Sequence, residues 1–149
     1  MNTWLLPANV NKNSKYHYEI DRALENLKTI FWAQSTPLKN IAVGEIVYIY
    51  ESSPVQAVGW KCKVLAVRAS YEATKEIDDS EFEHGDGGIS DFYIKITALA
   101  KYEGESRKKL AYRELRKNGL TTKMQSPIRA KDNLLEYINS VAPSVNYDE

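Results

Sequence analysis

The stretch KNIAVGEIVYIYESSPVQAVGWKCKVLAV, from Lys39 to Val67, decides the fold. Apolar side chains occupy both alternating faces of residues 46–51, and a second alternating run covers residues 57–67. A loop of four to six residues with a Ser-Ser-Pro sequence at 52–54 separates the two runs. This arrangement predicts an antiparallel hairpin.

Outward from the hairpin, strands and helices alternate. We expect further strands at 3–9, 92–102 and 122–130, and helices at 18–28, 106–119 and 131–141. Ser106 and Asp132 are the predicted N-caps of the last two helices. Short strands with helices at their ends predict an α+β fold with a small curled β-barrel. We expect a single domain at 1–142 and a frayed tail at 143–149.

The formal net charge of zero hides two segments of opposite sign. Residues 71–91 contain eight acidic residues and one basic residue, whereas residues 101–131 contain ten basic and three acidic residues. The basic segment suits phosphate groups, although two solvated surfaces of opposite sign explain the pattern equally well. The acidic segment also contains three of the seven glycines and is predicted to be a long mobile insertion.

No catalytic motif is visible. The single Cys62 excludes a cysteine-rich zinc site, and His17 and His84 have no metal-like spacing. The chain lacks a phosphate-binding P-loop and a nucleophile elbow. We therefore expect no enzymatic activity, no metal and no cofactor. No apolar run is long enough to cross a membrane and no signal peptide is recognisable, so the expected location is the cytoplasm.

Aromatic residues are the remaining functional signal. Ten Tyr, three Trp and three Phe are present, and aromatic faces bind flat bases by stacking. Trp4 and Trp60 alternate with apolar residues and are predicted to be core. Trp32 follows the first helix, where its indole lies either in the core or at the edge of a cleft.

The order of the segments resembles the EVE domain of the PUA-like superfamily, whose relatives include the YTH readers of methylated adenine in RNA. The most specific parts are NTWLLPAN at 2–9 and VGEIVYIYESSP at 43–54, and the likeness extends to about Val141. It implies a bent, PUA-like barrel with an aromatic pocket for a modified base, such as 5-methylcytosine, flipped out of nucleic acid.

The resemblance also implies site residues. Trp32 would form one wall of the pocket, with Tyr93, Tyr48 or Trp60 as the second aromatic wall. Gln34 stands near the position of a family arginine, so either Gln34 replaces it or the ligand differs. The remaining implied base-pocket residues are Asn9, Tyr50, Ser52 and Ser53, and the implied phosphate-binding residues are Lys123 and Arg129.

Several functional alternatives stay open. The implied partner is a nucleic acid carrying a modified base, and modules of this kind are commonly joined to nuclease or ATPase domains, which this chain lacks. An RNA-binding PUA-like module fits the sequence equally well, and a contact to a 2′-hydroxyl would distinguish it. A binder of free nucleosides or other small molecules would use the same aromatic pocket without contacts to a polymer.

Overall fold

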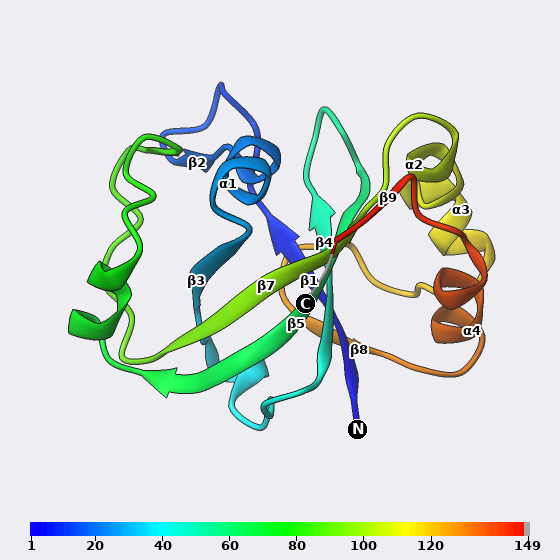
Figure 1. The fold of residues 1–149 in the computed structure, drawn as a ribbon. Coiled ribbons are helices and arrows are strands. Elements are labelled where there is room, and N and C mark those ends of the chain that lie inside the picture. The colour runs from blue at the N-terminus through cyan, green and yellow to red at the C-terminus, as the bar shows by residue number, and fades with distance from the viewer. Residues whose placement is uncertain (148–149) are drawn as a thin grey trace.

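The computed structural model describes residues 1–147, and its largest element is a curved, mixed sheet of seven strands (Figure 1). The strands pair in the order β3-β7-β5-β4-β1-β8, with β9 added to β7, and β2 and β6 form a separate small sheet. The strands are β1 (Thr3–Ala8), β2 (His17–Tyr18), β3 (Thr29–Ala33), β4 (Ile46–Glu51), β5 (Ala57–Ala69), β6 (Glu83–His84), β7 (Tyr93–Lys101), β8 (Ile128–Ala130) and β9 (Val145–Asn146). The helices are α1 (Ile20–Leu27), α2 (Glu105–Lys109), α3 (Tyr112–Lys117) and α4 (Asp132–Ser140), with 3₁₀ turns η1 (Thr36–Leu38) and η2 (Glu72–Glu76).

The predicted hairpin is confirmed as the antiparallel pair β4–β5. Its loop holds five residues, 52–56, and contains a cis peptide bond before Pro54. The register shifts between Ile49 and Tyr50, and β5 carries further shifts against β7. Such bulges bend and twist strands, which accounts for the curvature of β5 and β7 in Figure 1.

The prediction of a barrel is wrong in one respect, because the sheet does not close. β3 and β8 are the two edge strands, and they do not pair with each other in the described part of the chain. β8 has only three residues, and Pro127 precedes it, so little backbone remains to pair with a further strand. The α+β class is confirmed.

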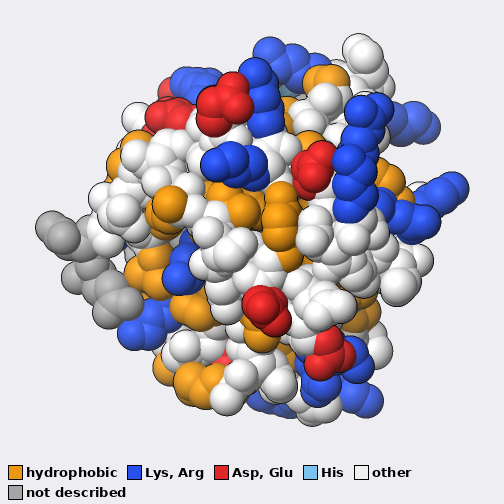
Figure 2. Space-filling model, turned by 90° about the vertical axis from the view of Figure 1, so that its right-hand side faces the viewer, with side chains coloured by type: hydrophobic (Ala, Val, Ile, Leu, Met, Phe, Trp, Pro, Cys, Tyr) orange, Lys and Arg blue, Asp and Glu red, His pale blue; other side chains and the backbone are white. Residues whose placement is uncertain are grey.

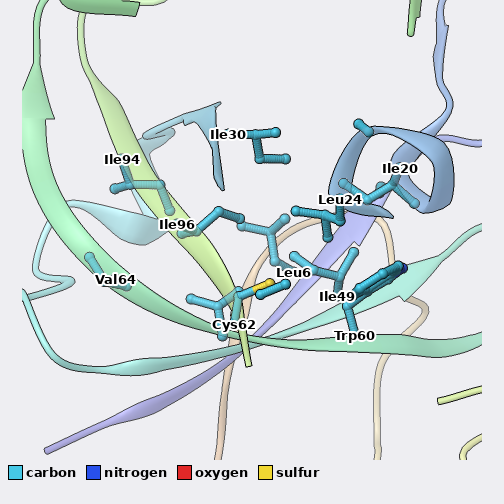
Figure 3. Close-up of a cluster of buried hydrophobic side chains, with 14 of the residues drawn as sticks. Leu6, Ile20, Leu24, Ile30, Ile49, Trp60, Cys62, Val64, Ile94 and Ile96 are labelled. Atoms are coloured by element: carbon cyan, nitrogen blue, oxygen red, sulfur yellow. The ribbon is translucent and has the colours of Figure 1, made fainter. Parts of the chain in front are cut away.

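Strand alternation divides the interior into two cores on opposite faces of the sheet. Figure 3 shows the first core, in which Leu6, Ile49 and Trp60 meet α1. The second core contains the alternate positions, such as Leu5 and Tyr48, and packs against α2–α4. The core assignments of Trp4, which is 4% exposed, and Trp60, which is 0% exposed, are confirmed.

Two predicted elements near the C-terminus differ from the structure. The helix expected at 106–119 is broken into α2 and α3, because the backbone of Leu110 and Ala111 pairs with the start of β5. Ser106 therefore lies inside α2, whose N-cap is Gly104, and its hydroxyl donates to the Glu103 carbonyl instead. Similarly, Lys131 rather than Asp132 is the N-cap of α4.

Two segments expected to lack structure are held by the sheet or by other strands. The tail predicted to fray from Pro143 instead forms β9 on β7, and the Tyr147 ring stacks on Trp60 with centroids 5.9 Å apart. Residues 148–149 of that tail lie outside the described residues. The acidic segment 71–91 forms η2 and β6 and buries Phe82. Long-range pairing, which leaves no local sequence signal, orders both segments.

Candidate functional site

One surface hollow has six aromatic side chains among its twenty lining residues, and we call it the aromatic hollow. It encloses about 790 Å³ between β3, the residues around β2 and the acidic segment. Six aromatic side chains line it: Tyr16, Tyr18, Phe31, Trp32, Tyr71 and Tyr93. The volume lies within the range of roughly 300–1,000 Å³ typical of small-molecule pockets.

Trp32 forms part of the wall from strand β3, which directly follows α1. Its indole is half-buried and contacts the Tyr18 ring edge-on, with the centroids 5.2 Å apart. On the same face of β3, Ile30 belongs to the first core. Trp32 thus lies where that core ends and the hollow begins, with part of its ring accessible to a ligand.

Tyr93, at the start of β7, lines the same hollow and lies near Tyr71, with the ring centroids 6.2 Å apart. Its hydroxyl accepts a hydrogen bond of 2.9 Å from the Ser90 backbone N–H. Trp32 pairs with Ile94 in the sheet, and Tyr93 is the residue before Ile94 on β7. Neighbouring strand residues point to opposite faces, and the two rings therefore approach the hollow from different sides.

Carboxylates hold the tyrosines of the wall. Tyr18 donates a 2.7 Å hydrogen bond to Asp79, and Tyr16 donates one of 2.9 Å to Glu83. Burial, followed by these hydrogen bonds, raises the pKa of both phenols well above the ordinary value, so both remain neutral and donating. Both carboxylates also line the hollow.

The loop at 85–88, inside the segment predicted to be a mobile insertion, is part of the wall. Gly85 has a φ of +92°, and a Cβ there would lie 2.1 Å from the carbonyl oxygen of Lys15. A Cβ at Gly87 would lie 2.8 Å from the Tyr16 ring. The absence of side chains at these two positions lets the loop pack directly against the Tyr16 segment.

A second hollow, of about 570 Å³, lies between α1, residues 10–13 and the β4–β5 loop, and we call it the α1–β4 hollow. Ser53, Asp21 and Glu51 are among its lining residues. Val10, Ile20, Pro54 and Val55 supply aliphatic parts of its wall, and the remaining lining residues are polar or charged: Asn11, Lys12, Asn13, Glu19 and Arg22.

A buried ionic cluster adjoins the α1–β4 hollow. Arg107 of α2 lies 3.2 Å from Asp21 of α1 and 3.4 Å from Glu51 of β4, and Trp60 donates a 2.7 Å hydrogen bond to Asp21. Glu51 is only 2% exposed, and its Oε2 has no hydrogen-bond partner among residues 1–147. Burial, together with the neighbouring Asp21 carboxylate, raises the pKa of Glu51 to about 9. Burial alone would raise the pKa of Asp21, but hydrogen bonds with Glu51 and Arg107 lower it.

The residues predicted for one base pocket are divided in the structure. Trp32 and Tyr93 share the aromatic hollow, whereas Ser53 lines the α1–β4 hollow. Ser52 and Asn9 contact each other at 3.4 Å beside the β4–β5 loop. The expected cleft with Trp32 on one wall and the Ser-Ser-Pro loop on the other is therefore not formed by either hollow.

Tyr50 and Gln34 line neither hollow. Tyr50 is buried in the second core and meets Tyr112 edge-on at 6.3 Å. The Gln34 side chain is engaged with backbone, donating to the Leu38 carbonyl at 3.0 Å and accepting from the Arg68 N–H at 2.7 Å. Both side chains stabilise the fold around β4 and β3.

Lys123 and Arg129, the candidate phosphate-binding residues, are exposed. Arg129 is on β8, the edge strand opposite β3. Figure 2 shows this side of the molecule, where blue Lys and Arg side chains gather along the top and right of the view. We call residues 101–131 the basic end. Figure 1 places its helices on the side opposite the acidic segment.

Sequence reasoning missed most of the aromatic hollow. It does not select Tyr16, Tyr18 and Tyr71, and it treats the acidic segment as an insertion. The weak signal available is the pair Tyr16 and Tyr18, which lies more than fifty residues before that segment, because the pairing of β2 with β6 that brings them to it is not local. Residues 1–147 contain no cluster of three or more His, Cys, Asp or Glu that could hold a metal ion, and none of their helices could span a membrane.

Comparisons with known proteins identify relatives by fold only. No family model matches the sequence, and no curated protein matches it. Human THYN1, solved in complex with DNA containing 5-methylcytosine, has 13% identity and a TM-score of 0.66 over 94% of this chain and 96% of its own. An ASCH protein from Zymomonas mobilis has 12% identity and a TM-score of 0.57 over 94% and 95%. A hypothetical protein from Leishmania major has 18% identity and a TM-score of 0.58 over 93% and 92%.

These structures share the open, curved sheet and the helices of this chain over more than nine-tenths of its length. At these identities the comparison concerns the fold alone. No site residue of these proteins is assigned to this chain by the comparison, and the resemblance to EVE domains and the PUA-like superfamily stays a proposal.

Proposed function

We propose that this protein is a non-catalytic module that binds a nucleobase of a nucleic acid in the aromatic hollow. The observation that carries the proposal is the half-buried Trp32 indole at the edge of a hollow of about 790 Å³ with five other aromatic walls. Stacking on an aromatic side chain stabilises a bound base by about 1–3 kcal/mol. That gain would offset the few kcal/mol needed to take the base out of a duplex.

The finer part of the proposal is that the base is modified, as in an EVE domain. The similarity in fold to THYN1, whose structure contains 5-methylcytosine DNA, supports this view. A methyl group would be recognised through apolar contact with the rings, which gives modest discrimination, on the order of 1–3 kcal/mol. Any cleavage of the nucleic acid would require a nuclease or ATPase partner.

The basic end supplies the phosphate contacts in this proposal. Eight of its Lys and Arg side chains are exposed: Lys108, Lys109, Arg113, Arg116, Lys117, Lys123, Arg129 and Lys131. Binding of a polymer through such residues releases counterions and weakens steeply as the salt concentration rises. Binding of a single base to the hollow needs no such release.

The proposal is tested with single- and double-stranded DNA and RNA, with and without modified bases, at two salt concentrations. Trp32→Ala should weaken binding of the preferred oligonucleotide by about 5–150-fold, which corresponds to about 1–3 kcal/mol. Phe92→Ala is the matched control, because Phe92 is an exposed aromatic next to Tyr93 that does not line the hollow. Equal affinity of Trp32→Ala and the parent protein would refute the site.

A second candidate is binding of free nucleosides without a polymer. The acidic lining of the aromatic hollow favours it, because carboxylates there would repel the phosphates of a nucleic acid. In that case nucleosides should bind with little salt dependence, and the oligonucleotide panel should show no added affinity. If RNA binds and DNA does not, a contact to the 2′-hydroxyl is indicated and the module is an RNA reader.

A further inference from the structure

The charge of the aromatic hollow is strongly one-sided. Four carboxylates line it: Asp78, Asp79, Glu83 and Asp86. Lys75 is the single basic residue among its lining residues in the described chain, and its ammonium lies 3.6 Å from Glu72 and 5.2 Å from the centre of the Tyr71 ring. Lys75 therefore offsets the charge of Glu72, which does not line the hollow, more directly than the charges of the four lining carboxylates.

The aromatic walls act in the same direction as the carboxylates. The face of an aromatic ring carries partial negative charge and attracts a cation placed over it. The protein already uses this attraction at the hollow, with Lys95 over the Phe31 ring at 5.7 Å and Lys75 over Tyr71. Four rings without a lysine over them and four carboxylates remain to attract a positively charged ligand.

The hydrogen bonds of the walls also favour a ligand that donates. The hydroxyls of Tyr16 and Tyr18 already donate to Glu83 and Asp79, so these phenols offer the ligand acceptor oxygens. Each of the two carboxylates keeps further lone pairs free for a donor. An exocyclic amino group, such as that of cytosine, adenine or guanine, meets this requirement, since carboxylates accept from base amino groups.

We infer, on the basis of the proposed function, that the aromatic hollow selects a base made cationic by methylation of a ring nitrogen. 7-Methylguanine, 1-methyladenine and 3-methylcytosine combine a flat ring, an amino or imino donor and a positive charge. A neutral base, including 5-methylcytosine, provides the ring and the donor without the charge. Cation–π contacts and carboxylate interactions should therefore give the cationic bases a higher affinity than the neutral ones.

The test is calorimetric titration with nucleosides at pH 7 and low salt. 7-Methylguanosine, 1-methyladenosine and 3-methylcytidine should each bind about tenfold more tightly than guanosine, adenosine and cytidine, respectively. 5-Methylcytidine should bind like cytidine within about threefold. A short oligonucleotide carrying one 1-methyladenine, compared with its unmodified counterpart, repeats the measurement in a polymer.

Variants separate the effect of the hollow from that of overall charge. Asp79→Asn with Glu83→Gln keeps the oxygen acceptors for Tyr18 and Tyr16 and should reduce the tenfold preference to about twofold. Glu81→Gln with Asp91→Asn removes the same number of charges from the acidic segment but outside the lining of the hollow, and should leave the preference unchanged.

The outcomes distinguish this inference from the proposed function. Equal binding of cationic and neutral nucleosides, with loss of both in Trp32→Ala, would overturn the charge preference and leave base binding intact. A preference that survives in the Asp79→Asn, Glu83→Gln protein would also overturn it. If no nucleoside and no oligonucleotide binds, the proposed function fails together with the inference.

Discussion

The acidic segment 71–91 and the basic end 101–131 differ in charge, in side-chain type and in position on the sheet. The acidic segment completes a hollow with aromatic walls beside edge strand β3. The basic end packs its helices on the second core and contributes no lining residue to either described hollow. The comparison suggests that base contacts and phosphate contacts, if both occur, are made by different regions.

An ionic cluster joins the basic end to α1, the helix that leads into the Trp32 side of the molecule. Asp21 lies on α1, which precedes the Trp32 strand, and Arg107 lies on α2 at the start of the basic end. Glu51 of β4 lies between them beside Gly59. Changes in this cluster therefore show whether the two regions behave as one folding unit.

Gly59→Ala should have the largest effect on stability. The added Cβ would lie 2.0 Å from Glu51 Oε2 and 2.8 Å from Arg107 Nη2, both in a buried position. Overpacking of this kind costs about 1–3 kcal/mol in the free energy of unfolding. Urea unfolding measures the loss. Gly88→Ala is the control for steric overlap, because a Cβ there meets nothing within 4 Å. Its φ of +75° adds some backbone strain.

If the regions form one unit, tryptophan fluorescence and circular dichroism should report the same lowered midpoint for Gly59→Ala. Separate transitions in the two signals would show that the aromatic side and the basic end unfold independently, and would contradict a connecting role for the cluster.

Removing charge from the basic end should have an intermediate effect that is confined to polymers. Lys108→Gln, Lys109→Gln and Arg113→Gln together should lower duplex affinity by about tenfold. They should also reduce the salt slope by up to about 2.7, because each neutralised phosphate contributes about 0.9 to that slope. Nucleoside affinity should not change. Lys39→Gln, an exposed lysine after η1, is the control. Reduced nucleoside binding in the triple variant would contradict the division between the regions.

Glu51→Gln should have the smallest effect on ligand binding, and should instead change the pH dependence of stability. The folded protein holds the Glu51 proton up to a pKa of about 9, whereas the unfolded chain releases it near the ordinary value of 4.5. The folded state therefore binds more protons across this window, so stability falls as the pH rises through it, by at most about 1.4 kcal/mol per pH unit.

Glutamine cannot ionise, and Glu51→Gln should show a flatter dependence of unfolding free energy on pH between 6 and 9. Urea titrations of both proteins at each pH measure it, with Glu136→Gln on the exposed part of α4 as the control. Parallel pH profiles for the parent and Glu51→Gln would show that Glu51 is ionised in the folded protein at neutral pH.

Local patterns accounted for much of the fold. Alternation identified the β4–β5 hairpin and the buried Trp4 and Trp60, and helical spacing identified α1, because these signals depend only on nearby residues. The break between α2 and α3 and the strand β9 depend on pairing with β5 and β7, which lie far away in sequence. The open sheet likewise depends on how few residues β8 contributes.

The site was predicted less completely than the fold. Trp32 and Tyr93 were selected and share one hollow, but Ser53 lies at another, because the curvature of the sheet decides which strand ends face one another. The tyrosines and carboxylates that complete the aromatic hollow come from a segment without strong periodicity. Their contribution becomes visible only when β6 pairs with β2.

The most direct test follows the indole N–H signals of the three tryptophans by ¹⁵N–¹H NMR during titration with 7-methylguanosine, with Trp32→Phe used to assign the Trp32 peak. Trp4 and Trp60 donate their indole N–H to Glu45 and Asp21 inside the protein, whereas Trp32 lines the aromatic hollow. The account predicts that the Trp32 signal shifts saturably while the other two stay in place. A shift of the Trp60 signal, whose Asp21 partner borders the α1–β4 hollow, with Trp32 unmoved would contradict it.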